Sequence, residues 1–257
     1  MACRRALAGR PPGGTDRWVR TNHRGEQVTL LEGPAVAAGL AAAALLTAGL
    51  PGRVRAAAAV AGAGAGAFGV YDDLVGGRDR RGFKGHLGAL TRGEVTSGAV
   101  KIAGIGAAGL AGAGLVRRGP VDALLAGAIV AATANLVNLL DLRPGRALKG
   151  SLLLAAAEAT HGGPGRRLAA AVTGCALAAL PDDLGERSML GDAGANALGA
   201  VLGVAVATRA PRSALVARLG VLTALTLASE RVSFTRVIEA TPVLREIDAA
   251  GRRPRTT

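Results

Sequence analysis

Aromatic residues and cysteine are scarce in this chain, and its start shows no secretory leader. Phe, Trp and Tyr make up only 2% of the 257 residues, while glycine alone contributes 39. The two cysteines are Cys3, in a polar leader, and Cys175, inside an apolar stretch, so neither a disulfide framework nor a cysteine-rich metal site is expected. The first sixteen residues contain arginine but no apolar run, which predicts that there is no signal peptide.

Acidic residues are also in short supply, with 18 Asp and Glu against 31 Lys and Arg, and the formal net charge is +13. Such an excess can indicate a nucleic-acid ligand, but here the basic residues are spread over short junctions and form no single stripe or tail. We therefore expect no nucleic-acid partner. An anionic membrane leaflet or a phosphate-bearing substrate accounts better for the positive charge.

Apolar stretches without charge are abundant. A membrane-spanning helix needs about 20 apolar residues, with a lower limit of roughly 17. Eight charge-poor stretches alternate with polar junctions. The alternative is a soluble, alanine-rich helical protein, but the cores of such proteins usually show fewer charge-poor stretches. The sequence therefore predicts an all-α, polytopic membrane protein with about eight transmembrane helices. The expected ranges are 33–50, 54–71, 95–116, 121–140, 147–161, 166–181, 191–208 and 213–229.

The junctions between these helices fall into two alternating sets. The set that includes both chain ends holds about twice as many Lys and Arg residues as the other, so the positive-inside rule places it in the cytoplasm. We expect a cytoplasmic leader and first loop at 1–32, a transmembrane domain at 33–229 and a basic cytoplasmic segment at 230–257. Both termini would then be cytoplasmic, and the site would lie on the cytoplasmic face.

Two adjacent acids, Asp72 and Asp73, follow the second apolar stretch. Neighbouring carboxylates repel each other unless a cation compensates, and an acid is unfavourable at a helix C-terminus. Such a pair can hold Mg²⁺ or take a proton from a phosphate-bearing nucleophile. A solvated helix end is the plainer interpretation of the same residues.

Three polar residues, Asn135, Asn138 and Asp141, are spaced by three and share one face of the fourth expected helix. Polar groups at the end of an apolar helix are costly unless they bind a ligand or pair with another helix. A binding site and interhelical hydrogen bonding are equally good explanations of this motif taken alone.

Three more charged residues lie close to apolar stretches. Asp192, in a Gly-Asp-Ala-Gly sequence, can be a helix cap or a metal ligand. Lys101, inside the third expected helix, either reaches the inner surface or pairs with an acid such as Asp72 or Asp73. Glu158, near the outer end of the fifth, is expected to extend toward the membrane surface.

These motifs resemble those of the polyprenyl-phosphate N-acetylhexosamine-1-phosphate transferases in their order, in their spacing and in the side of the membrane on which they are expected to lie. That superfamily contains the phospho-MurNAc-pentapeptide transferase of peptidoglycan synthesis and is also classed as glycosyltransferase family 4. The resemblance rests on the Asp pair at 72–73, the Asn-x-x-Asn-x-x-Asp motif at 135–141 and the Gly-Asp-Ala-Gly motif at 191–194. The stretch 20–25 resembles the first cytoplasmic loop of the family.

The resemblance implies transfer of a sugar-1-phosphate from a UDP-sugar to a polyprenyl phosphate, with release of UMP and with Mg²⁺ as cofactor. It also implies a bacterial inner-membrane location, a role in cell-envelope glycan synthesis, and allows a homodimer. The implied catalytic residues are Asp72, Asp73 and Asp192, of which Asp192 and Asp72 would hold the metal. The implied substrate-binding residues are Asn22, His23, Lys84, Lys101, Asn135, Asn138 and Asp141.

The chain departs from the family pattern in three respects. After Asp141 the family continues with Gly-x-Asp-Gly, whereas this chain has Arg143 and Arg146 in place of a second acid. The last cytoplasmic loop, 230–239, lacks the histidine cluster of the family, and ten helices are reduced to eight. A non-catalytic paralogue that binds polyprenyl phosphate or nucleotide as a regulator or scaffold is therefore an alternative. A small ion transporter is a weaker one, because the acids cluster at one surface and not at mid-membrane.

Overall fold

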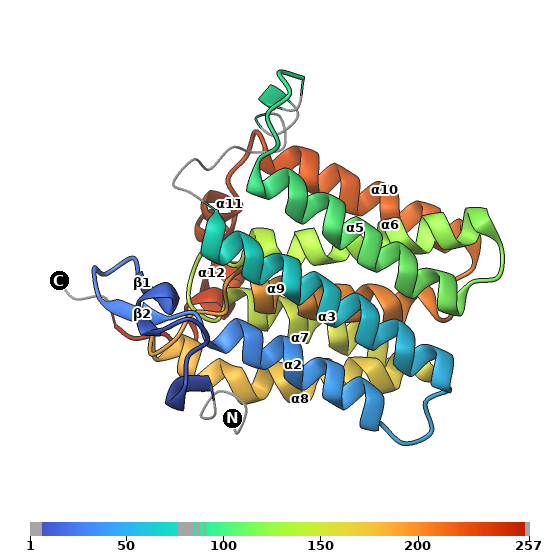
Figure 1. Ribbon diagram of the computed structural model, residues 1–257, viewed down its shortest axis with the longest axis horizontal. Coiled ribbons are helices and arrows are strands. Elements are labelled where there is room, and N and C mark those ends of the chain that lie inside the picture. Colours follow the sequence, from blue (N-terminus) through green and yellow to red (C-terminus); the bar gives the residue numbers. More distant parts are fainter. Residues whose placement is uncertain (1–6, 77–84, 86–87, 90, 255–257) are drawn as a thin grey trace.

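The chain folds into a bundle of antiparallel helices with a small hairpin at one end (Figure 1). The computed structural model describes residues 7–76, 85, 88–89 and 91–254. Each of the eight ranges predicted from the sequence contains a helix. These helices are α2 (Glu32–Leu46), α3 (Gly52–Val75), α5 (Ser97–Val116), α6 (Pro120–Leu140), α7 (Arg146–Ala159), α8 (Pro164–Leu184), α9 (Gly191–Ala207) and α10 (Arg212–Ser229).

Five short elements gather at the end of the bundle where the hairpin lies (Figure 1). Sequence analysis did not predict them, because each is too short to show a hydrophobic period. Trp18, Leu30 and Leu31 form a small core beneath the hairpin. The five are the 3₁₀ helix η1 (Thr15–Trp18), the antiparallel strands β1 (Val19–Thr21) and β2 (Gln27–Thr29), and the helices α11 (Phe234–Ala240) and α12 (Pro242–Ala249).

Two helices extend beyond their predicted ends. Helix α3 continues to Val75, so Asp72 and Asp73 lie in its last turns and not in a junction. Helix α8 passes Pro181 and ends at Leu184. Acids near a helix C-terminus oppose the helix dipole, so these carboxylates need partners from outside their own helices.

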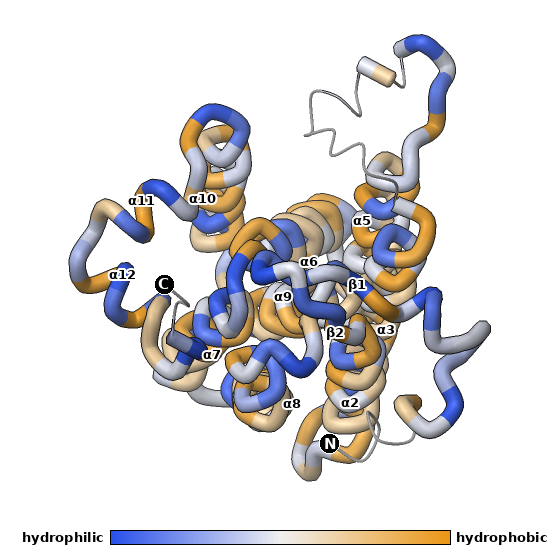
Figure 2. The backbone as a smooth tube through the Cα atoms, turned by 90° about the vertical axis from the view of Figure 1, so that its left-hand side faces the viewer, coloured by the Kyte–Doolittle hydropathy of each residue, from blue (hydrophilic) through white to orange (hydrophobic). Residues whose placement is uncertain are grey.

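Helix α9 forms the centre of the bundle, with the other helices around it in the end-on view of Figure 2. All but one of its residues from Gly191 to Ala207 are buried. Glycines make the close packing possible, because small residues let helix backbones approach each other closely. A Cβ atom on Gly69 of α3 would lie 2.6 Å from the Cα of Ala193, and one on Gly199 would lie 2.5 Å from the Cα of Ala134 in α6.

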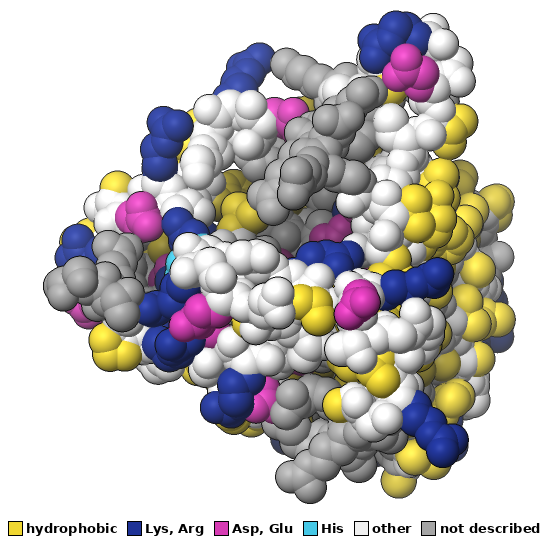
Figure 3. Space-filling view, turned by 60° about the vertical axis from the view of Figure 1, so that its left-hand side comes forward, with side chains coloured by type: hydrophobic (Ala, Val, Ile, Leu, Met, Phe, Trp, Pro, Cys, Tyr) yellow, Lys and Arg dark blue, Asp and Glu magenta, His cyan; other side chains and the backbone are white. Residues whose placement is uncertain are grey.

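In the part of the chain that the structure describes, four helices, α3, α5, α6 and α10, are long and apolar enough to cross a membrane. The structure therefore supports an all-α membrane protein, while the prediction of eight crossings stays a prediction. Large apolar side chains point outward along the flanks, and charged side chains gather at the hairpin end (Figure 3). The outward-facing residues include Ile102, Leu110, Leu115, Val121, Leu124, Leu153, Leu177, Val216, Val221 and Leu227.

Glu158 does not extend toward the membrane surface, so that prediction was wrong. The carboxylate is buried and accepts hydrogen bonds from Arg209 at 3.0 Å and from Arg218 of α10 at 2.8 Å. A buried charge is tolerated only when it is paired, and the two arginines pair this one. The contact with Arg218 also holds α10 against the bundle, and Leu215 is the one buried residue of that helix.

The glycine packing predicts a contrast between two substitutions within helices. Gly199→Ala should lower the free energy of unfolding by about 1–3 kcal/mol, because the new methyl group would overlap backbone atoms of α6. Gly114→Ala should leave it unchanged or raise it by up to about 1 kcal/mol, because nothing lies within 4 Å of that Cβ position. Thermal unfolding in detergent measures both. Equal melting temperatures for the two variants would contradict the packing.

Candidate functional site

Lys101 joins two of the predicted catalytic acids. Its Nζ atom lies 2.6 Å from Oδ2 of Asp72 and 2.5 Å from Oδ2 of Asp192. Of the two interpretations of this lysine, pairing with an acid is therefore correct. Asp72 is one of its partners, whereas Asp73 is not. Between 15% and 26% of each of the three side chains is exposed, so a ligand can reach the group. Helices α3, α5 and α9 meet at this point.

Asp73 has a different position from its neighbour. Its Oδ1 and Oδ2 atoms accept hydrogen bonds from the backbone N–H groups of Asp192 and Ala193, at 3.1 and 3.0 Å. Asp73 thus caps α9 from a neighbouring helix, where a negative charge also suits the helix dipole. The side chain of Asp192 makes no cap bond, so the cap interpretation of that residue was wrong. Its carboxylate is directed to Lys101 instead.

Backbone geometry and the hairpin support this arrangement. Gly191 has a φ of 62°, which favours glycine, and a Cβ atom there would lie 3.0 Å from Oδ2 of Asp73. Arg20 of β1 donates a hydrogen bond to the backbone carbonyl of Asp73. The first predicted loop therefore contacts the acid pair directly.

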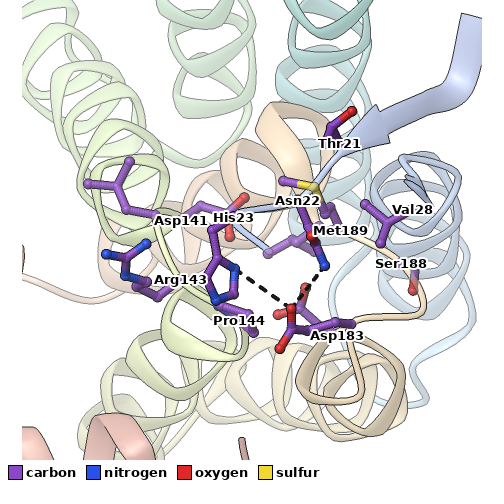
Figure 4. Close-up of a pocket in the computed structure, with 13 residues that line it drawn as sticks. Thr21, Asn22, His23, Val28, Asp141, Arg143, Pro144, Asp183, Ser188 and Met189 are labelled. Atoms are coloured by element: carbon purple, nitrogen blue, oxygen red, sulfur yellow. Dashed lines mark hydrogen bonds and ion pairs between the residues drawn. The ribbon is translucent and has the colours of Figure 1, made fainter. Parts of the chain in front are cut away.

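A pocket of about 320 Å³ lies between the hairpin, the α6–α7 turn and the α8–α9 junction (Figure 4). It brings together Asn22, His23 and Asp141, three of the predicted substrate-binding residues. Asn22 Nδ2 donates to Oε2 of Glu186 at 2.9 Å, and His23 Nδ1 lies 3.7 Å from the same atom. The lining residues are Thr21, Asn22, His23, Val28, Asp141, Leu142, Arg143, Pro144, Asp183, Glu186, Ser188, Met189 and Leu190.

Asp141 of the pocket lies within the electrostatic influence of acids on both sides, those of the pocket and those near Lys101. Burial raises the pKa of Asp141 well above its ordinary value, and the negative charges of Asp183, Asp192, Asp73 and Glu32 add to the effect. Asp192 pairs with Lys101 and Asp73 holds the start of α9, whereas Asp183 lines the pocket. The predicted motifs therefore form one extended polar region at this end of the bundle.

Sequence analysis missed two acids of the pocket, Asp183 and Glu186. Oδ2 of Asp183 accepts a hydrogen bond from the backbone N–H of Gly145 at 2.6 Å. Glu186, which has a φ of 54°, is also paired with Arg24 at 2.9 Å. Both acids fall in the range 182–190, which was predicted to be a junction on the cytoplasmic side, where the motifs also lie. That common side of the membrane was the one indication that these acids could belong to the site.

The remaining predicted residues are not all part of the pocket. Asn135 donates from Nδ2 to Oγ1 of Thr226 in α10 at 3.0 Å, so interhelical hydrogen bonding explains this amide. Oδ1 of Asn138 is buried and has no hydrogen-bond partner among the residues that the structure describes. Lys84 lies outside the described residues.

Arg146, one of the arginines that replace the expected second acid, attaches the C-terminal segment. Its guanidinium forms a bidentate pair with Asp248 of α12, at 2.7 and 3.0 Å. Arg252 binds the same carboxylate at 2.6 Å and the carbonyl of Pro144, which lines the pocket, at 2.8 Å. Burial alone would raise the pKa of Asp248, but the hydrogen bonds from the two arginines hold it below its ordinary value.

The carboxylates can be tested against the predicted Mg²⁺. Within the described part of the chain, no group of three or more His, Cys, Asp or Glu residues is arranged to hold a metal ion. Asp72 and Asp192 nevertheless converge on one cation, the Lys101 ammonium. Protein Mg²⁺ sites commonly use one or two carboxylates and take the other ligands from substrate phosphates and water. Asp72 and Asp192 are therefore the two carboxylates that would hold Mg²⁺ together with substrate phosphates and water.

Removal of the central cation should destabilise the site. We expect Lys101→Met to lower the free energy of unfolding by about 1.5–3 kcal/mol, because two neighbouring carboxylates lose their shared partner. Adding Asp192→Asn to this variant should restore part of the loss by removing the repulsion. Melting temperatures of the wild type, both single variants and the double variant give the coupling energy. Strictly additive effects would contradict the pairing.

The attachment of the C-terminal segment can be tested by hydrogen exchange. Asp248→Asn should increase exchange of the amides between 242 and 252 by at least about tenfold, since the two arginine contacts lose the charge that holds them. Because the pKa of Asp248 is lowered by folding, the attachment should be complete above its ordinary value of 3.8 and weaken as pH falls below it. Asp122→Asn, which changes a half-buried acid paired with Arg212, is the matched control. Unchanged exchange in Asp248→Asn would contradict the attachment.

Comparison with known proteins gives no relative for this fold and site. No protein-family model, no curated protein and no solved structure matches the chain. The resemblance to the polyprenyl-phosphate transferases therefore stays a prediction carried by the motifs and their positions.

Proposed function

We propose that this protein transfers a sugar-1-phosphate, of the N-acetylhexosamine type, from a UDP-sugar to a polyprenyl phosphate and releases UMP. The observation that carries the proposal is the meeting of Asp72, Lys101 and Asp192 from three helices beside a polar pocket. Asn22, His23 and Asp141 line that pocket. Carboxylates, a lysine and a nucleotide-sized cavity at one end of apolar helices suit a reaction between a soluble diphosphate and a membrane lipid.

In this reaction a phosphate oxygen of the lipid attacks the phosphorus next to the sugar. A new P–O bond forms to the lipid phosphate, and the diphosphate P–O bond of the UDP-sugar breaks. UMP leaves with the electron pair of that bond, and a polyprenyl-diphosphate sugar remains in the membrane. Positioning and charge stabilisation carry most of the catalysis in such transfers.

The described residues divide these tasks. Lys101 would contact phosphate oxygens and offset their charge, and Asp72 would hold or deprotonate the lipid phosphate. Asp73 acts as a positioning residue, because both its carboxylate oxygens hold the start of α9 and thereby place Asp192. Asn22 and Asp141 would bind the nucleoside part in the pocket.

Asp72 and Asp192 are the residues that would hold Mg²⁺. When bound, the metal neutralises negative charge on the reacting phosphates.

The proposal includes a bacterial cytoplasmic membrane as location, with both termini and the site on the cytoplasmic side. The basic side chains around the pocket, among them Arg24, Arg143 and Arg252, suit that face because its lipids are anionic. The polyprenyl phosphate would approach from the membrane and the UDP-sugar from water. Envelope glycan synthesis is the process that such a reaction serves.

A second candidate is a non-catalytic paralogue that binds polyprenyl phosphate or nucleotide. One specific observation favours it: Lys101 already neutralises the two carboxylates that a metal would need. Arg146 also binds Asp248 where the family pattern would have a second acid. Binding without turnover would distinguish this protein from an enzyme.

The direct test is UMP release by the purified full chain in detergent, with polyprenyl phosphate, Mg²⁺ and a panel of UDP-sugars. We expect release with at least one donor, dependence on Mg²⁺, and a loss of at least about 100-fold in Asp192→Asn, because one of the two carboxylates that would hold Mg²⁺ loses its charge. Asp122→Asn, which removes an acid from the opposite end of the bundle, should retain full activity.

No release with any donor, in folded protein that still binds polyprenyl phosphate, would overturn the catalytic proposal in favour of the paralogue. Equal release by Asp192→Asn and the wild type would remove Asp192 from the mechanism.

A further inference from the structure

The turn between α6 and α7 is held by α8 and by the C-terminal segment. The backbone N–H of Gly145, whose φ is 73°, donates to Asp183 at 2.6 Å. The carbonyl of Pro144 accepts from Arg252 at 2.8 Å, and Arg146 is paired with Asp248. Asp183 and the network of Arg146, Arg252 and Asp248 thus fix the turn, so a side chain that the turn carries is presented in a defined position.

One such side chain is Arg143. It is half-buried and lines the pocket (Figure 4), yet it has no hydrogen bond or ion pair with any residue in the described part of the chain. Other arginines near the pocket are already paired, Arg24 with Glu186 and Arg252 with Asp248. The three acids of the pocket do not take up its charge either. Glu186 binds Arg24, Asp183 accepts from the Gly145 amide, and Asp141 forms no ion pair with Arg143.

An unpaired guanidinium in a pocket is a strong attractor for an oxyanion. Its planar set of donors matches two phosphate oxygens, and the partial exclusion of water strengthens the contact. Asp141, two residues earlier, also lines the pocket, where it can accept hydrogen bonds from a ligand. A ligand with N–H or O–H donors at one end and a phosphate group at the other satisfies both side chains.

We propose that Arg143 is the anion anchor of the pocket and binds the diphosphate of the nucleotide substrate directly, without a metal ion. The identity of that anion as a UDP-sugar diphosphate rests on the proposed function, whereas the binding of a diphosphate as such does not. Two consequences follow. Arg143 determines preference for a nucleoside diphosphate over a nucleoside, and nucleotide binding persists when Mg²⁺ is removed.

Calorimetric titration of the full chain in detergent with EDTA tests the anchor, using UDP, uridine and inorganic diphosphate as probes. Wild-type protein should bind UDP at least about tenfold more tightly than uridine, because charge-assisted hydrogen bonds to phosphate are gained. Arg143→Gln should lose at least about tenfold in affinity for UDP and for diphosphate, while uridine affinity stays unchanged. Arg143→Lys should retain part of the affinity.

The control is Arg53→Gln, which removes the same charge from the exposed start of α3, at the other end of the bundle. It should bind all three probes as the wild type does. Equal UDP affinity in Arg143→Gln and the wild type, or no binding of UDP or diphosphate in EDTA, would overturn the inference.

The failure of this inference is distinguishable from the failure of the proposed function. Diphosphate binding that depends on Arg143, in protein that releases no UMP from any donor, overturns the proposed function and supports the anchor. Release of UMP by protein whose UDP affinity does not depend on Arg143 supports the proposed function and overturns the anchor.

Discussion

The rest of the site depends on the ion pairs of Lys101 with Asp72 and Asp192. Two carboxylates at the ends of closely packed helices would repel each other, and the ammonium group between them removes that repulsion. The pairs form only because α3 and α9 approach each other through glycine, at positions such as Gly69. Asp73 then fixes the start of α9 by accepting two of its backbone N–H groups. The small residues along these helices thus determine where the charged side chains meet at the hairpin end of the bundle.

The pocket depends on segments that are not part of the apolar bundle. The hairpin supplies Asn22 and His23, the turn after α6 supplies Asp141 and Arg143, and the end of α8 with the junction that follows supplies Asp183 and Glu186. The C-terminal segment contacts two of these parts, since Arg252 binds the α6–α7 turn and Arg24 of the hairpin donates to the carbonyls of residues 253 and 254. Polar loops are therefore ordered by salt bridges and by hydrogen bonds to backbone, while the bundle is ordered by close packing.

Much of the fold could be predicted from the sequence, because charge-free stretches of this length, separated by polar junctions, are typical of apolar helices. The pairing of Lys101 with Asp72 was also predictable, since a lysine in an apolar helix needs an acid nearby. The hairpin, α11 and α12 were not predictable, because they are too short to show a period. Asp183 and Glu186 were missed because they belong to no motif and enter the pocket only through the chain reversal between α8 and α9. The cap provided by Asp73 was hidden because its two bonds join residues more than a hundred positions apart.

The central claim is that the nucleotide site lies where the hairpin, the α6–α7 turn and the α8–α9 junction meet. Photo-crosslinking with an azido derivative of UDP, followed by mass spectrometry of the digested protein, tests this location most directly. The account predicts that the modified peptides contain residues 21–28, 141–146 or 182–190, and that excess UDP prevents the labelling. Modification confined to other peptides, or labelling that excess UDP does not reduce, would contradict it.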